Sequence, residues 1–436
     1  MRALGIVVTA AILFTTNTMS GQIKRTTVPL GDAVDKALAK SSLLGEGARP
    51  FHIYVSVSEP ENPASPYQGT IEEWWAAPSQ WRREVTAKGG MRQTIVVVDG
   101  KKTERDEGEY FPLWLRGFVS ATFDIIPDAA GWRASGGSIP QIAASNGENS
   151  GSCAHVKFSI GSGASATDAF AGICFDGTGR LKSYFGPRYS MELSDYRSFG
   201  KKQIARKLED DPEPGTHLVG DVTRLEEMPK DGSAALFAPL PTEDDRFRSA
   251  AVNSNQMEQL VAGNAPIRWP AVRSGNTHGR LAMYVSVDAA GHVRETWPLN
   301  SDNAGLEDPA REQVRHWTTK PAVADGKPVQ VDGGLGFAFD TKIGDPLPEL
   351  SDEEVRALAT RIVEPVWGPG LGHSGDVVEV DIGVNEQGKL TGEGYTKVPS
   401  NLQGPVMAAI SQWTFRPLIR DGKPQYFHGV VRFVVP

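Results

Sequence analysis

The chain has 436 residues, of which 39% are hydrophobic and 22% are charged, and its formal net charge is −8 at pH 7. This composition is ordinary for a globular protein, and the length suggests about three domains of roughly 150 residues each. The acidic balance gives no electrostatic basis for binding nucleic acid or an anionic membrane, so we expect neither as a partner.

Residues 1–20 have the layout of a secretory signal peptide. Arg2 precedes an apolar run of 12 residues, 3–14, and small and polar residues then lead to Ser20 and Gly21. The run is shorter than the roughly 20 residues that a membrane-spanning helix needs. We therefore predict cleavage after Ser20 or Gly21 and export of the mature chain. The alternative is an uncleaved inner-membrane anchor.

The region from residue 46 to residue 245 is predicted to be a β-rich domain, which follows a polar and partly helical segment at 21–45. From Phe51 onward apolar residues alternate with polar ones, and strand-like runs recur up to about residue 228. Turn signals such as Asp99-Gly100 separate these runs. The pattern predicts a curved antiparallel sheet with few helices. One helix is expected near residues 112–126.

The two cysteines, Cys153 and Cys174, lie in two of these runs, on either side of a Gly/Ser-rich segment. A hairpin would bring the two thiols face to face. We predict a structural disulfide, which would close a loop of about 20 residues and contribute ~3 kcal/mol. The spacing offers little for metal or redox chemistry.

A twelve-residue phrase occurs twice in the C-terminal part of the chain. It reads WTTKPAVADGKP at 317–328 and WTFRPLIRDGKP at 413–424, an offset of 96 residues. In the helix expected before each phrase, apolar residues coincide at the same offset, and their spacing of 4, 4 and 3 places them on one helical face. The matching pairs are Leu306 and Leu402, Ala310 and Val406, Val314 and Ile410, and Trp317 and Trp413.

We therefore predict a duplicated domain, with a first unit at 246–345 and a second unit at 346–436. Each unit is expected to run strand, turn, strand, helix and hairpin. A helix or helical linker is predicted at 246–265, and a second helix is predicted to start at the capping box of Ser351 and Glu354 and to pack on the second unit.

The repeated phrase is interpreted as architecture. Its Trp ends the helix, its first Pro forces the residue before it into an extended conformation, and its Asp-Gly pair favours a tight hairpin turn. Nothing in it is a nucleophile, a base or a metal ligand. The residues assigned this structural role are Trp317, Pro321, Asp325, Gly326, Trp413, Pro417, Asp421 and Gly422.

The order of elements and the W-x-x-(K/R)-P-x-x-x-D-G-K-P phrase resemble the C-terminal domain of TonB-family proteins, in two tandem copies. That resemblance implies small α+β domains working in the periplasm. It also implies that a strand edge pairs with a peptide of an outer-membrane receptor or other envelope protein, linked to outer-membrane transport. The chain has a β-rich domain where the energy-transducing members have a long Pro-rich spacer, so a passive binding role is expected.

Under this interpretation the peptide-binding edge lies in the last strand of the second unit, with its counterpart at residues 333–339. The candidate residues are Tyr426, His428, Val430, Arg432 and Val434. The alternative is that these edges are already paired within a unit or between the two units, because proteins usually cover an exposed β edge.

The N-terminal β-rich region more weakly resembles the periplasmic lipoprotein-carrier (LolA-like) fold, in which a curved sheet wraps a hydrophobic cavity plugged by helices. The resemblance lies in the layout of a leading helix followed by strands, and it implies a lipid or lipoprotein as ligand. Large apolar residues would then line the cavity, or they would simply form the core. The candidates are Trp74, Trp75, Trp81, Trp114 and Phe118.

Catalytic signals are weak. The eight histidines show no paired metal-ligand spacing, and the GxGxxG match at 370–375 has a helix before it and a strand after it, the reverse of a dinucleotide-binding unit. Glu72 and Glu73 are adjacent, so on a strand they face opposite sides. We expect a non-enzymatic periplasmic interaction protein without cofactor or metal. A lipid or lipoprotein carrier is the alternative, and an enzyme would need a site assembled only in three dimensions.

Overall fold

The computed structural model describes residues 27–140, 151–213, 216–228, 233–241, 244–272, 274–344, 348–368, 372–399, 402–420 and 422–435. The predicted signal peptide, Asp421 and part of the GxGxxG match lie outside the described residues. Within the described ranges, no helix is long and apolar enough to cross a bilayer. The chain is rich in β-sheet with short helices, which agrees with the predicted β-rich α+β class.

The β-rich region forms one antiparallel sheet of eleven strands in the order β6-β5-β4-β3-β2-β13-β12-β11-β10-β9-β8. We call this part the sheet domain. Its strands are β2 (Phe51–Ser58), β3 (Gly69–Ala77), β4 (Gln80–Ala87), β5 (Met91–Val98), β6 (Lys101–Glu107), β8 (Gly151–Ile160), β9 (Thr167–Asp176), β10 (Leu181–Phe185), β11 (Ser190–Phe199), β12 (Lys202–Glu213) and β13 (Thr216–Glu227).

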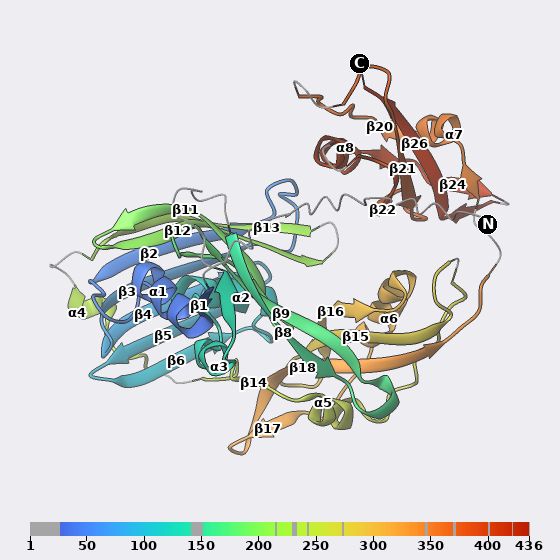
Figure 1. Cartoon of the computed structure of the whole chain (residues 1–436). Coiled ribbons are helices and arrows are strands. Elements are labelled where there is room, and N and C mark those ends of the chain that lie inside the picture. Colours follow the sequence, from blue (N-terminus) through green and yellow to red (C-terminus); the bar gives the residue numbers. More distant parts are fainter. Residues whose placement is uncertain are drawn as a thin grey trace, which may run out of the picture.

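Two helices lie across the inner, concave face of this curved sheet (Figure 1). Helix α1 (Leu30–Ser41) buries one apolar face, as an amphipathic helix should. Helix α2 (Leu113–Phe123) falls within the predicted range of 112–126 and buries nine of its 11 residues. A helix that is apolar nearly all round has to be enclosed, and the sheet and α1 enclose it within one hydrophobic core.

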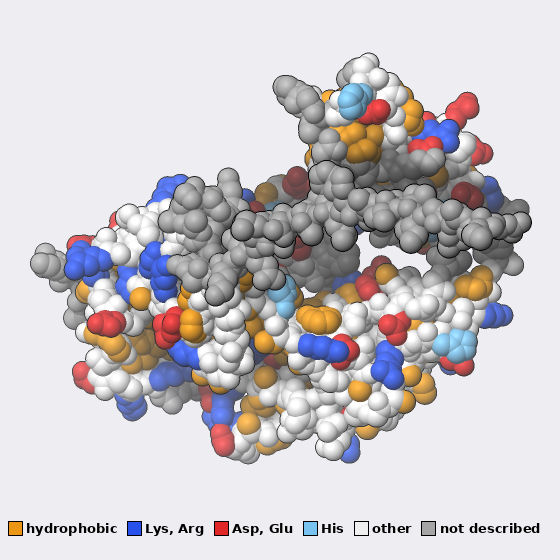
Figure 2. Space-filling model, viewed as in Figure 1, with side chains coloured by type: hydrophobic (Ala, Val, Ile, Leu, Met, Phe, Trp, Pro, Cys, Tyr) orange, Lys and Arg blue, Asp and Glu red, His pale blue; other side chains and the backbone are white. Residues whose placement is uncertain are grey.

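Smaller elements complete the sheet domain. Strands β1 (Thr27–Pro29) and β7 (Ser138–Pro140) form a two-stranded sheet, and helices α3 (Ala129–Ala134) and α4 (Ser233–Leu236) are short. In the view of Figure 2, Lys and Arg side chains are interspersed with Asp and Glu over the described surface.

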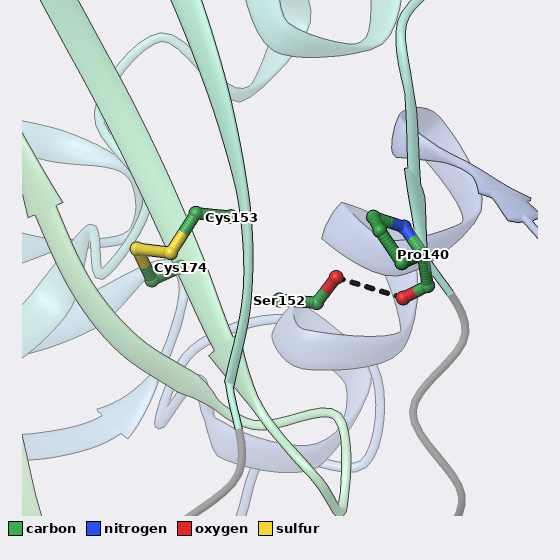
Figure 3. Close-up of a disulfide and its surroundings, with 4 residues drawn as sticks. All are labelled: Pro140, Ser152, Cys153 and Cys174. Carbon is green, nitrogen blue, oxygen red and sulfur yellow. Dashed lines mark hydrogen bonds between the residues drawn. A yellow bond between two sulfur atoms is a disulfide. The ribbon is translucent and has the colours of Figure 1, made fainter.

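The predicted disulfide is confirmed. Cys153 in β8 and Cys174 in β9 are direct cross-strand partners, with their Cα atoms 4.1 Å apart, and their sulfurs are bonded (Figure 3). Next to this link, Ser152 Oγ donates a hydrogen bond of 2.7 Å to the carbonyl of Pro140. The bridge thus fastens the outermost hairpin of the sheet, and the neighbouring hydrogen bond ties that hairpin to β7.

The first unit is a sheet in the order β14-β18-β15-β16 with two helices. Its elements are β14 (Ser249–Ala251), α5 (Ser254–Val261), β15 (His278–Val287), β16 (Val293–Ser301), α6 (Glu307–Arg315), β17 (Ala322–Ala324) and β18 (Lys327–Asp340). The helix expected at 246–265 is therefore shorter than predicted, and a strand, β14, precedes it.

The second unit has the same order, β19-β26-β21-β22. Its elements are β19 (Glu349–Leu350), α7 (Asp352–Leu358), β20 (Ala359–Arg361), β21 (Val377–Val384), β22 (Leu390–Lys397), α8 (Gln403–Ile410), β23 (Thr414–Phe415), β24 (Leu418–Arg420), β25 (Lys423–Gln425) and β26 (Phe427–Val434). The capping box of Ser351 and Glu354 is present at the start of α7, as predicted.

The structural repeat is longer than the sequence repeat suggests. In both units a short strand pairs in parallel with the last strand, and a helix that begins at a capping box follows it. The apolar residues that match at the offset of 96 are buried in separate cores of the two units, with Trp413 fully enclosed and Trp317 only partly buried.

The hairpin role of the repeated phrase is visible in the first unit. Asp325 and Gly326 both have positive φ values, 52° and 77°, and they connect β17 to β18. Positive φ at both central residues defines the type I′ turn, which the Asp-Gly pair favours.

Candidate functional site

The predicted cavity residues divide between the two faces of the sheet. The core beneath α2 contains Trp75, and Trp81 packs against that core. Two other candidates, Trp114 and Phe118, are buried side chains of α2 itself. Trp74 does not join them, because successive strand residues point to opposite faces. Its ring stacks on His52, with ring centroids 4.9 Å apart, on the outer face. The prediction that Trp74 lines the cavity is wrong.

The interior beneath the helices is closed in this structure. A crevice between the helices and strands β2, β11, β12 and β13 has a volume of only about 10 Å³. That volume is at the lower limit for a single water molecule. Helix α2 fills the remaining space, and it sits so close to β13 that a Cβ at Gly220 would lie 2.7 Å from the ring of Phe118. A ligand can therefore enter only if α2 moves.

One ion pair lies within this apolar interior. Arg83 Nε donates to Glu73 Oε2 over 2.5 Å, and the Arg83 guanidinium lies 3.8 Å from the ring centroid of Phe123 at the end of α2. Burial raises the pKa of Glu73, and Arg83 offsets only part of that effect. Glu72 points to the other face and contacts His52, so the two adjacent carboxylates are separated, as the strand pattern predicts.

The N-terminal end of α2 is held by the first unit. The Glu295 carboxylate on β16 accepts hydrogen bonds from the backbone N–H of Leu113 (2.5 Å) and of Trp114 (3.3 Å). Unpaired N–H groups and the helix dipole make a helix N-terminus favourable for a carboxylate. The residue before the helix, Pro112, offers no side-chain cap. Glu295 therefore acts as a cap supplied from another part of the chain.

Further buried contacts connect the segment 110–116 to the first unit. Phe111 N donates to Gln330 Oε1 over 2.7 Å, and Arg116 Nη1 donates to Asp332 Oδ1 over 2.7 Å. The Tyr110 hydroxyl donates to the Glu295 carboxylate and lies 2.7 Å from Ser286 Oγ.

We call this group the α2 clamp. Its members are Tyr110, Phe111, Leu113, Trp114 and Arg116 from the sheet domain and Ser286, Glu295, Gln330 and Asp332 from the first unit.

The clamp has unusual electrostatics because it is fully enclosed. Burial raises the pKa of Glu295 despite the hydrogen bonds and the nearby Arg116 charge that favour its ionised form. Burial and the Glu295 charge raise the pKa of Tyr110 well above its ordinary value. Burial alone would lower the pKa of Arg116, but the Asp332 carboxylate more than offsets it and raises that pKa.

A groove of about 920 Å³ opens beside the clamp, between the first turn of α2, the end of β12 with the start of β13, and β16, and Ser411 of the second unit also lines it. Such a volume is within the range of small-molecule sites. Aromatic residues in its wall are Trp114, Tyr189 and Trp297, and charged or titratable ones are Arg188, Asp210, Asp211 and His217. Of these, the sequence predicts only Trp114 as a site residue.

The predicted peptide-binding edge of the second unit is covered within the unit itself. On β26, His428 N donates to the carbonyl of Pro348, which precedes β19, and Arg432 N donates to Asp352 Oδ1 over 2.9 Å. Arg356 Nη2 donates to the Arg432 carbonyl over 2.8 Å. The expectation of an open edge is corrected: the strand pairs with β21 on one side and with β19 and α7 on the other.

Four of the five candidate residues alternate along β26 and face away from the buried core of the unit, and the fifth, Tyr426, directly precedes the strand. The four are His428, Val430, Arg432 and Val434. The counterpart in β18 is also covered, because Gly334 and Gly336 lie against Ile160 and Ser165 of the β8–β9 hairpin. The alternative weighed from the sequence, an edge paired within its own unit, describes the second unit. In the first unit the covering hairpin belongs to the sheet domain, which was not predicted.

Titratable side chains do not gather into a metal site in the part of the chain that the structure describes, where no group of three or more His, Cys, Asp or Glu residues has that geometry. The ionisable groups of the α2 clamp are engaged with one another, Tyr110 with Glu295 and Arg116 with Asp332.

Two solved structures have a limited structural similarity to this chain. An outer membrane lipoprotein-sorting protein domain from Vibrio parahaemolyticus is 7% identical, with a TM-score of 0.25, over 48% of this chain and 95% of that one. A LolA-superfamily protein from Nitrosomonas europaea is 9% identical, with a TM-score of 0.26, over 48% of this chain and 98% of that one. Neither a family model nor a curated protein matches the chain.

Both structures belong to the class that the N-terminal region was expected to resemble. Similarity at these TM-scores does not establish a function, so the function is inferred from the geometry of the site. The resemblance of the two units to TonB C-terminal domains stays a prediction.

Proposed function

We propose that this protein is a non-enzymatic, exported carrier that receives the acyl chain of a lipid or lipoprotein between the concave face of its sheet and α2. The observation that carries the proposal is α2 itself, which buries nine of 11 residues against that face. When such a helix moves outward, it leaves an apolar trough lined by core side chains of the sheet.

The energetics of α2 support movement as one piece. Its apolar side chains hold it by non-directional burial, which stabilises the packed state by about 25 cal/mol per Å² of apolar surface. An acyl chain buried in the same trough replaces the hydrophobic free energy that is lost when the helix leaves. Directional hydrogen bonds concentrate at its N-terminal end, in the α2 clamp. This arrangement favours a helix that pivots about its clamped end.

The covered edges of β18 and β26 argue for the carrier over strand-edge peptide binding. A peptide would have to displace β19 and α7, or the β8–β9 hairpin, before it could pair. Interior binding needs only the displacement of α2.

The test is acyl-chain binding to the purified full chain, measured by calorimetry with neutral-headed amphiphiles of 8 to 16 carbons below their micelle concentrations. Saturable one-to-one binding is expected, with affinity rising for each added carbon because a buried CH₂ contributes roughly 0.8 kcal/mol. The variant Phe118→Ala, which empties space beneath α2, is expected to bind more tightly. Ile419→Ala, an exposed apolar side chain in the second unit, is the matched control.

Binding that does not depend on chain length, or an equal effect of the two variants, would contradict the proposal. Both variants retain the clamp residues, so a change in affinity cannot be ascribed to loss of the interface with the first unit.

A further inference from the structure

The groove beside the α2 clamp shares a wall with the proposed acyl site. Leu113 and Trp114, in the first turn of α2, line the groove, and Trp114 is also part of the hydrophobic core beneath the helix. The groove holds about 920 Å³ where the interior crevice holds about 10 Å³. An amphiphile whose chain lies under α2 can therefore place its headgroup in the groove.

Aromatic side chains occupy fixed positions in this wall. Trp297 Nε1 donates to the carbonyl of Pro187 over 3.0 Å, and its ring stacks on Tyr284 with ring centroids 5.6 Å apart. Tyr189 lines the groove from the loop before β11. Aromatic faces attract cations, and this attraction strengthens where water is excluded.

Asp210 is the group in the groove that lacks a counter-ion. It points to the inner side of β12, two residues after buried Leu208, and it has no side-chain partner among the described residues. Burial and the adjacent Asp211 charge raise the pKa of Asp210 to about 8, although the backbone N–H of Asp211 opposes this shift. A largely buried carboxylate without a partner is costly, and a cation beside it removes that cost.

The other charged groups around Asp210 are already engaged. Arg188 lies 2.9 Å from Asp332, and the Glu295 carboxylate accepts the N–H groups of α2. Asp211, which also lines the groove, contacts His217 over 2.8 Å. Tyr184, a neutral phenol whose pKa burial raises well above its ordinary value, faces Asp210 from β10. Above about pH 8, where Asp210 is ionised, the remaining charge in the groove is therefore negative.

We propose that the groove is a headgroup site for ammonium, with Asp210 as the counter-ion and the rings of Trp114, Tyr189 and Trp297 around the bound cation. This inference rests on the proposed carrier function, which supplies the acyl chain. It adds the class of ligand: an amphiphile with a cationic nitrogen in its headgroup.

The test compares four dodecyl probes on the full chain by calorimetry, carrying quaternary ammonium, primary ammonium, sulfate or a neutral headgroup. The quaternary probe is expected to bind at least tenfold tighter than the sulfate probe at pH 9. Because that probe does not titrate, its affinity should fall more than about tenfold between pH 9 and pH 6.5, as Asp210 takes up its proton. The neutral probe should change little over that range.

Two isosteric variants distinguish the effect of the Asp210 charge from the effect of the net charge of the protein. Asp210→Asn is expected to weaken both ammonium probes about tenfold or more and to leave the neutral probe within about twofold. Asp221→Asn removes an equal charge from an exposed position on neighbouring β13 and should affect no probe. Binding of the neutral probe to Asp210→Asn also shows that the variant is folded.

The outcomes distinguish the two proposals. If the neutral and charged probes bind equally well, or if Asp210→Asn weakens all four, the headgroup inference fails while the carrier function stands. If no probe binds, including the neutral one, the carrier function fails and the headgroup inference fails with it.

Discussion

Asp332 is the residue on which the attachment of α2 to the first unit most depends. Its side chain is 0% exposed, and it lies 2.7 Å from Arg116 and 2.9 Å from Arg188. The Tyr284 hydroxyl also donates to it over 3.3 Å. The substitution Asp332→Asn keeps the shape of the side chain and removes its charge.

The size of the effect follows from what remains after the substitution. Arg116 is 7% exposed and cannot lose its proton, so the variant leaves a buried cation without a counter-ion. Removing one partner of a buried pair typically costs about 3–5 kcal/mol. The free energy of unfolding of a protein is of the order of 5–15 kcal/mol, so this single substitution should remove a large share of the stability.

Chemical denaturation of the full chain measures this loss directly, and hydrogen exchange of the amides in 113–123 measures release of α2. In Asp332→Asn the free energy of unfolding should fall, and the amides of α2 should exchange faster. The matched control is Asp340→Asn on the same strand, because the Asp340 side chain is 81% exposed and its ion-pair partner among the described residues, His278, is exposed too. Surface changes of this kind stay within about 0.5 kcal/mol.

A second substitution tests whether the unpaired Arg116 causes the loss of stability. If the loss comes from the orphaned cation, adding Arg116→Met to Asp332→Asn should restore at least about 1 kcal/mol, because an apolar residue tolerates the buried site. A loss below about 1 kcal/mol for Asp332→Asn alone, or no recovery in the double variant, would refute the reasoning.

Two further predictions concern the sheet domain. Replacing Cys153 and Cys174 with serine should lower the free energy of unfolding by about 3 kcal/mol in urea denaturation, because the bridge closes a loop across a sequence separation of 21 residues; a loss equal to that of a surface substitution would contradict it. Asp106 is buried, and burial raises its pKa to about 7 although the backbone N–H of Phe247 opposes the shift. The folded state thus holds a proton that the unfolded state releases near pH 4, and stability should fall between about pH 4 and pH 7. Asp106→Asn should remove that slope, and parallel stability curves for variant and wild type would count against the assignment.

Local periodicity predicts the parts of this fold that depend on neighbours in sequence. The alternating runs, the Asp-Gly turn at Asp325 and the hairpin that pairs Cys153 with Cys174 were all predictable, since each is specified within a few residues. The duplicated helix faces were predictable because the same spacing occurs twice.

Period-two alternation also accounts for the error at Trp74. The rule that separates Glu72 from Glu73 equally separates Trp74 from Trp75, so only one of the two tryptophans could line the interior. Applying the rule to both pairs would have assigned Trp75 alone. Strands as short as β14 and β19 have too few residues to show any period, and for that reason these two strands could not be located from the sequence, although covered edges were one of the two expectations.

The α2 clamp had no sequence signal. Its members are separated by roughly 170 to 220 positions along the chain, and each alone reads as an ordinary polar residue. A buried carboxylate such as Glu295 reveals its role only when the fold places it against a helix N-terminus. The same holds for Asp210, which appears in the sequence as one of two adjacent aspartates.

The duplication distinguishes the residues that build each unit from the residues that contact α2. The positions that recur at the offset of 96 are helix faces, turn residues and tryptophans, and the apolar side chains among them pack in the core of their own unit. The clamp positions do not recur: Gln330 and Asp332 of the first unit correspond to Tyr426 and His428 of the second. Neither replacement can supply the buried carboxylate that holds Arg116. The second unit therefore cannot substitute for the first at α2, and loss of clamp residues should affect the proposed carrier function even though a second copy of the fold remains intact.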